Sequence, residues 1–146
     1  MVTYKSILQQ FFFTWEGFSA TPYWDYKQWS WGYGTKVPGS VNDPNIKPGG
    51  TITRDKAMAD ALNHVQVDYD YLKKFITRPL NANQWSALLS FSYNLGSGNA
   101  DNLAYNINTY QNELLEDQWK KYIYAGGEIN QGLIDRRNAE WELWQA

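Results

Sequence analysis

Apolar side chains recur at helical spacing near the start of the chain. They follow the i, i+3, i+4, i+7 rule of an amphipathic helix at Tyr4, Ile7, Leu8, Phe11, Phe12 and Trp15. Glycine adopts the left-handed conformation after a helix at little cost, so Gly17 marks the expected end. The pattern therefore predicts a helix with Glu16 at its carboxyl end.

The pattern changes between Thr21 and about Thr53, where glycine and proline are frequent and aromatic residues alternate with polar ones. Such a segment favours two or three short antiparallel strands joined by loops. A long helix is then predicted from Thr53, a suitable N-cap, to about Phe75, with Asp55 in its first turn. The inner stripe of this helix comprises Ala57, Ala61, Val65, Leu72 and Phe75.

Asparagine at position 81 and glutamine at position 84 resemble a capping box. They precede an apolar helix predicted over 85–95, which the segment Gly96-Ser97-Gly98 ends. Shorter helices are expected near 101–108, 113–124 and 133–144, with turns between them such as Gly126-Gly127. The whole pattern predicts one α+β domain over 1–146, with a hairpin lobe (about 17–53) and a helical lobe (about 1–16 plus 54–146). A long helix joins the lobes, and a cleft lies between them.

Composition narrows the possible functions. The 146 residues include 8 Trp, 11 Tyr and 6 Phe, more rings than a core of this size needs, which suggests that some line a binding surface. The chain has no cysteine and one histidine, His64, so thiolate chemistry, disulfides and multi-His metal centres are excluded. We expect no metal and no cofactor. The net charge of −2 shows no basic excess of the kind that nucleic-acid binding requires.

No apolar run is long enough to span a membrane, and the first residues do not resemble a signal peptide. We therefore expect neither membrane insertion nor export by the chain itself. We also expect a monomer in solution.

Two carboxyl groups stand out, because Glu16 and Asp25 lie in or next to a segment rich in tryptophan and tyrosine. A carboxyl crowded by rings retains its proton and can act as an acid, while a wetter one stays ionised. One protonated and one ionised carboxyl group are the pair that glycosidic bond cleavage needs.

Three segments together resemble the phage-type lysozymes, the endolysin family of muramidases. The first is Glu16-Gly17-Phe18, followed by Asp25 nine residues after the glutamate and by Gly32-Tyr33-Gly34. The second is 80–96, similar to the central helix of the family, and the third is 124–140, similar to its C-terminal signature. The resemblance runs over nearly the full chain and implies a lysozyme-like fold. It also implies hydrolysis of the bond between N-acetylmuramic acid and N-acetylglucosamine in bacterial peptidoglycan.

By this resemblance Glu16 is the general acid that protonates the leaving glycosidic oxygen. Its position at a helix carboxyl end beside Trp15 and Phe18 independently favours the protonated form. Asp25 is implied to stabilise positive charge on the sugar and to aim a water in an inverting reaction. The alternatives are a solvated carboxylate at a helix end for Glu16 and a turn residue for Asp25.

The third catalytic position of the family, usually threonine, corresponds to Ser30 when the Gly32-Tyr33-Gly34 strand is aligned. A turn centred on 27–28 would pair Asp25 directly with Ser30, with their Cβ atoms about 5 Å apart. Thr35 is the less favoured source of this hydroxyl. Half of the hairpin aromatics are expected to face the helical lobe as packing, from the set Trp24, Trp29, Trp31 and Tyr33.

The resemblance also implies sugar contacts from Tyr33, Tyr93 and Asn94, and a supporting role for Arg137. One arginine of the pair 136–137 could form an ion pair near Glu16, and the alternative is two solvated arginines on a terminal helix. As an endolysin, the protein would fold in the host cytoplasm and need a membrane-permeabilising partner to reach the wall. Two alternatives stay open: a glycosidase acting on chitin-like polymers, and a sugar-binding module without catalysis.

Overall fold

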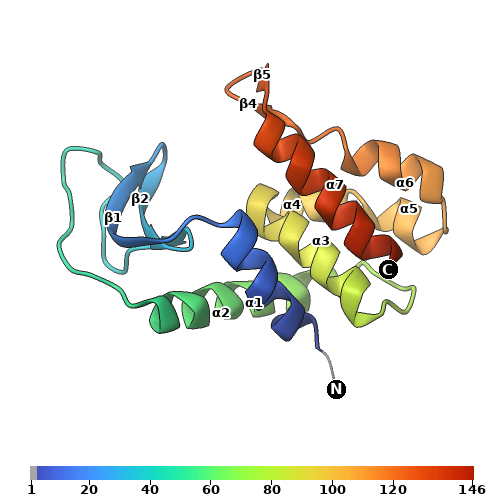
Figure 1. The fold of residues 1–146 in the computed structure, drawn as a ribbon, viewed down its shortest axis with the longest axis horizontal. Coiled ribbons are helices and arrows are strands. Elements are labelled where there is room, and N and C mark those ends of the chain that lie inside the picture. The colour runs from blue at the N-terminus through green and yellow to red at the C-terminus, as the bar shows by residue number, and fades with distance from the viewer. Residues whose placement is uncertain (1–2) are drawn as a thin grey trace. The chain divides into compact units, whose positions relative to one another are not determined.

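The computed structural model describes residues 3–146, and the first two residues of the predicted domain lie outside the described part. The helices are α1 (Tyr4–Trp15), α2 (Arg54–Leu72), α3 (Ala82–Leu95), α4 (Ser97–Asp101), α5 (Ala104–Asn108), α6 (Asn112–Trp119) and α7 (Gln131–Gln145). The strands are β1 (Ser19–Asp25), β2 (Gln28–Gly32), β3 (Thr35–Lys36), β4 (Tyr124–Ala125) and β5 (Glu128–Ile129) (Figure 1). The predicted α+β class is confirmed.

The described chain forms two compact units. One unit comprises residues 9–65 and contains the three-stranded antiparallel sheet β1-β2-β3. The other comprises residues up to Leu8 together with Gln66–Ala146, and it contains most of the helices and the small β4-β5 hairpin. Among the helices of the described residues, none is both long and apolar enough to cross a membrane.

The two long helices of the first half of the chain follow their predicted patterns. In α1 the stripe is confirmed, because Leu8 and Phe12 are fully buried. In α2 the backbone N–H of Lys56 donates to the Thr53 hydroxyl at 3.1 Å, which confirms the N-cap. The expectation that Phe75 belongs to the inner stripe is wrong. The helix ends at Leu72, so Phe75 lies beyond it and does not continue its buried face. The Phe75 side chain is 42% exposed.

The β1-β2 hairpin closes one residue earlier than expected. Asp25 pairs with Gln28 and Tyr23 pairs with Ser30, so the turn consists of Tyr26 and Lys27. The predicted direct pairing of Asp25 with Ser30 is therefore wrong. The partner of Asp25 moves by two residues, from Ser30 to Gln28, so Asp25 and Ser30 still lie on the same face of the sheet.

This register also places the three hairpin tryptophans together. Trp24 pairs with Trp29, and Trp31 lies two residues further along β2, so all three share one face. The expected even division of the hairpin aromatics between two faces is therefore wrong for the tryptophans. The Trp29 indole N–H donates to the backbone carbonyl of Asp43 at 2.8 Å, which ties the loop after β3 onto this face.

Gly32 allows the sheet to approach α2 closely within the same unit. A Cβ atom on Gly32 would lie 2.8 Å from the Cβ of Ala57, and the φ angle of Gly32 is +60°. Both the space and the backbone conformation therefore require glycine here. The loop after β3 returns beside the sheet, where the Ile52 N–H donates to the Ala20 carbonyl at 2.9 Å.

In the other unit, α3 begins at the predicted capping box. The Asn81 side chain accepts from the Gln84 N–H at 2.8 Å, and the Gln84 side chain accepts from the Asn81 N–H at 3.0 Å. Seven consecutive residues of α3, positions 86–92, are buried, and α7 lies alongside this helix (Figure 1). The predicted central core helix is thus confirmed.

Two of the three later helices differ from their predicted bounds by being shorter or divided. The predicted helix over 113–124 ends at Trp119, because Tyr124 instead pairs with Ile129 in the β4-β5 hairpin. Gly126 and Gly127 form its turn, and both have positive φ angles, as a two-residue hairpin turn requires. The predicted helix near 101–108 is divided between α4 and α5, with residues 102 and 103 outside both.

Candidate active site

Glu16 is the first residue beyond α1. Its backbone N–H still donates to the Phe12 carbonyl at 2.9 Å, but the chain then turns through Gly17 into β1. Its carboxyl group therefore follows the last turn of the helix, where the unpaired carbonyl groups favour the neutral form of an acid. One of the two carboxyl oxygens is buried. The local sequence thus produces the placement that was expected for an acid.

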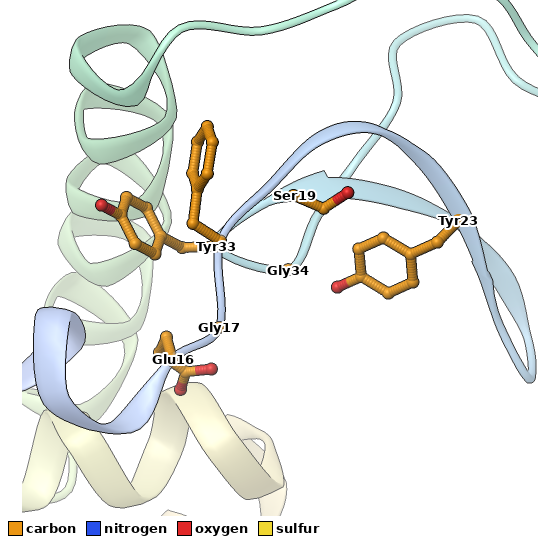
Figure 2. Close-up of a pocket in the computed structure, with 7 residues that line it drawn as sticks. Glu16, Gly17, Ser19, Tyr23, Tyr33 and Gly34 are labelled. Atoms are coloured by element: carbon orange, nitrogen blue, oxygen red, sulfur yellow. The ribbon is translucent and has the colours of Figure 1, made fainter.

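A pocket of about 370 Å³ opens beside this carboxyl group (Figure 2). The residues that line it come from the α1-β1 connection, from β1 and from the β2-β3 turn. They are Glu16, Gly17, Phe18, Ser19, Tyr23, Tyr33 and Gly34. Three of the seven are aromatic, and four carry polar side-chain groups when the two tyrosine hydroxyls are included, a combination that suits a ligand with both apolar faces and hydroxyl groups.

Asp25 and Ser30 lie on one face of the hairpin. The register gives Tyr23, Asp25, Gln28 and Ser30 a common face, because cross-strand partners and residues two apart point the same way. The Ser30 hydroxyl donates to an Asp25 carboxylate oxygen over a long 3.5 Å, and the Gln28 amide donates to the Ser30 oxygen at 3.0 Å. The Asp25 carboxylate and the Ser30 hydroxyl are thus adjacent, as predicted from the sequence. They are diagonal neighbours across the two strands and not direct cross-strand partners.

Thr35 occupies the opposite face of this sheet. It pairs with Trp31, so it shares the tryptophan face and points away from the face of Asp25. Lys36 pairs with Ser30 and continues the polar face onto β3. The preference for Ser30 over Thr35 as the source of a hydroxyl beside Asp25 therefore has a direct structural reason.

Tyr23 connects the pocket with the polar face of the hairpin. It lines the pocket with Glu16 and stands two residues before Asp25 on the same strand face. Burial raises the pKa of the Tyr23 phenol above its ordinary value, and the charges of Asp25 and then Glu16 raise it further. Both carboxyl groups therefore lie within electrostatic range of one hydroxyl. Tyr23 is not among the site residues that were predicted from the sequence. Its position two residues before Asp25 is the signal that could have identified it.

Tyr33 forms the inner wall of the pocket. Its side chain is only 1% exposed, and its ring centroid lies 5.5 Å from that of Phe18 and 6.2 Å from that of Phe13. The Arg54 guanidinium lies over the Phe18 ring, 4.3 Å from its centroid. Figure 2 shows the Tyr33 hydroxyl pointing away from Tyr23. Its role as a sugar contact stays a prediction.

The remaining candidates belong to the helical unit. The Asn94 side-chain oxygen accepts from Arg137 at 2.8 Å, and the Arg137 Nε lies 2.8 Å from a Glu140 oxygen. Arg136 and Arg137 are both buried, so the alternative of two solvated arginines is wrong. The sugar contacts from Tyr93 and Asn94, and an ion pair near Glu16, stay predictions.

Glu140 is the centre of this buried polar cluster. Its carboxylate accepts from the Ser90 hydroxyl at 2.6 Å and the Trp119 indole at 3.1 Å, in addition to both arginines. Such a buried carboxylate is stable only when its charge and its oxygens are fully paired. Within residues 3–146, no three His, Asp or Glu side chains gather in a way that could hold a metal ion.

The combination of a small antiparallel sheet with a larger set of helices is lysozyme-like, and solved structures share this fold. The muramidase domain of SpmX from Asticaccaulis excentricus aligns with a TM-score of 0.80 at 19% identity, over 96% of this chain and 95% of that one. The endolysin from Escherichia coli O157:H7 phage FAHEc1 aligns with a TM-score of 0.77 at 23% identity, over 98% and 91%.

The sequence matches the phage lysozyme family over residues 13–140, and the chain belongs to this family. It is also 30% identical over 104 residues to the endolysin of Bacillus phage PZA, which covers 70% of this chain. The aligned part spans only 40% of that endolysin. The chain therefore corresponds to less than half of the length of this curated relative.

Proposed function

We propose that this protein hydrolyses the β-1,4 bond between N-acetylmuramic acid and N-acetylglucosamine in the glycan strands of bacterial peptidoglycan. The observation that carries the proposal is the position of Glu16, directly beyond a helix carboxyl end and at the wall of a partly aromatic pocket. Family membership supports the same class of reaction, glycoside hydrolysis.

In this proposal Glu16 donates its proton to the glycosidic oxygen as the bond to the anomeric carbon breaks. The leaving sugar departs as an alcohol, and positive charge develops on the ring that remains. Asp25, ionised, stabilises this charge and accepts a hydrogen bond from the attacking water. The Ser30 hydroxyl, held by Gln28 beside Asp25, fixes the direction of that water. The water adds to the anomeric carbon, and its proton passes to Asp25.

The proposal implies inversion at the anomeric carbon. An inverting enzyme needs roughly 6.5–9.5 Å between its two carboxyl groups to admit a water, whereas a retaining enzyme needs about 5 Å.

We propose that the protein folds in the host cytoplasm, requires a separate partner that permeabilises the membrane, and then acts at the wall as a monomer.

The test compares wild type with Glu16→Gln in clearing a peptidoglycan suspension. Glutamine keeps the shape and cannot donate an acidic proton, so we expect a loss of at least about 100-fold, the usual scale of general acid catalysis. Glu128→Gln, an exposed residue of β5, removes the same charge and serves as the control. Equal clearing by Glu16→Gln and wild type would exclude the assigned acid.

Analysis of the cleaved ends tests the reaction itself. Hydrolysis leaves a reducing muramic acid, whereas a lytic transglycosylase leaves an anhydro end. If neither wild type nor variant cleaves but both bind the polymer, the protein is a sugar-binding module. Preferential cleavage of chitin oligomers over peptidoglycan strands would assign it to chitin-like substrates instead.

A further inference from the structure

Tyr23 presents a polar group in the pocket that the proposed reaction does not use. Its side chain is 38% exposed and lines the same pocket as Glu16. Figure 2 shows its hydroxyl pointing toward the side of the pocket formed by Gly34 and Glu16. A Cβ atom at position 34 would lie 4.0 Å from this hydroxyl, so the glycine leaves the space beside it open.

The hydroxyl is also available to a ligand. Among the described residues, no side chain or backbone group forms a hydrogen bond with it. The phenol keeps its proton, because burial and the two neighbouring carboxyl groups raise its pKa above the ordinary value. Tyr23 is therefore a hydrogen-bond donor over the whole pH range in which carboxyl groups can catalyse. The charges of Asp25 and Glu16 both act on this hydroxyl, and both carboxyl groups accept hydrogen bonds when ionised.

We propose that Tyr23 is a substrate-binding residue, whose hydroxyl donates a hydrogen bond to an oxygen of the sugar seated against Glu16, while its ring forms one wall of that site. This inference rests on the proposed function and extends it. A sugar offers hydroxyl and acetamido carbonyl oxygens as acceptors. Besides Tyr23, the pocket lining supplies the Glu16 carboxyl group, the rings of Phe18 and Tyr33, and the Ser19 hydroxyl, which already donates to the Thr21 carbonyl at 2.7 Å. The Tyr23 hydroxyl thus complements the acceptors of the substrate where the carboxylates cannot.

Tyr23→Phe tests the proposal, because phenylalanine keeps the ring and removes only the donor. With soluble peptidoglycan glycan strands, we expect kcat/KM to fall about three- to tenfold, the effect of one neutral hydrogen bond. Tyr26→Phe is the matched control. It removes the same hydroxyl from a residue that is 81% exposed, next to Asp25 in sequence and outside the pocket lining. It should change kcat/KM less than twofold.

A binding measurement separates this inference from the proposed function. In a Glu16→Gln background, which should not cleave, we expect the added Tyr23→Phe change to weaken binding of a muramic acid-containing tetrasaccharide by about three- to tenfold. Unchanged binding and unchanged kcat/KM would overturn the inference while leaving Glu16 as the acid. If wild type bound the tetrasaccharide without cleaving it, and Tyr23→Phe weakened that binding, the proposed function would fail and the role of Tyr23 would stand.

A second readout leaves Tyr23 itself unchanged. In Glu16→Gln protein with ¹³C-labelled tyrosine, the Cζ resonance of Tyr23 should shift when the tetrasaccharide binds, because its hydroxyl gains an acceptor. The Cζ resonance of Tyr26 should stay in place. A Tyr23 resonance that is unmoved at saturation would contradict the contact.

Discussion

The Ser30 hydroxyl lies 3.5 Å from the Asp25 carboxylate, although the two residues are not cross-strand partners. Ser30 is paired with Tyr23 and Asp25 with Gln28, so the contact runs diagonally across the hairpin. The Gln28 amide holds the serine oxygen at 3.0 Å, which orients the hydroxyl hydrogen toward the carboxylate. The hairpin thereby presents an acceptor and a hydroxyl side by side with Tyr23.

We predict that Ser30→Ala lowers kcat about tenfold on soluble glycan strands. The substitution removes the neutral hydroxyl that is proposed to position the water but leaves the carboxylate, so the loss should match that of one hydrogen bond. Ser40→Ala is the control, since the Ser40 hydroxyl donates to the Val37 carbonyl in the loop after β3. A Ser30→Ala enzyme with the wild-type kcat would show that this hydroxyl takes no part in the reaction.

Tyr23 should also make stability depend on pH in alkaline solution. Its pKa is raised in the folded state above the ordinary 10.0, so the unfolded chain loses this proton first as pH rises. The contribution to the unfolding free energy is complete below about pH 10 and is lost as pH rises through the folded-state pKa. Tyr23→Phe should therefore reduce the fall in unfolding free energy between about pH 9 and about pH 11, measured by urea denaturation. An equally steep fall in the variant would contradict this assignment.

Gly32→Ala should destabilise the unit that contains the sheet. The added methyl group would lie 2.8 Å from the Ala57 Cβ, and the φ angle of +60° is unfavourable for alanine. We expect a loss of about 2–4 kcal/mol in unfolding free energy, measured by chemical denaturation. Gly98→Ala, in α4, has open space around its Cβ position and is the control; it should be neutral or stabilising. Equal stability of the two variants would exclude close packing at Gly32.

Glu140→Gln should be more damaging than any surface substitution on α7. Glutamine keeps the volume but leaves two buried arginines without their counter-charge, at a cost of about 3–5 kcal/mol. Glu142→Gln is the control, because it removes the same charge from an exposed position two residues further along the helix. Denaturation of both variants checks the prediction. A loss for Glu140→Gln as small as that of the control would mean that the cluster is not a stabilising centre.

Local signals in the chain were sufficient for most of the helices and for the position of Glu16. The helical spacing of Leu8 and Phe12 and the glycine after Glu16 act over a few residues, and so does the capping box of Asn81. Each depends on backbone geometry and neighbouring side chains alone. The placement of Glu16 just past a helix end follows from them directly.

The hairpin register, the pocket and the arginine cluster depended on residues that are distant in sequence. The pairing decides which side chain lies directly opposite Asp25, and the bond from the Trp29 indole to the Asp43 carbonyl, 14 residues away, helps to hold the hairpin in place. The burial of Arg136 and Arg137 likewise depends on acceptors from α3 as well as from α7. Periodicity along a chain describes which positions are apolar, but only long-range packing determines which polar groups become partners, because an unpaired buried charge is too costly to retain.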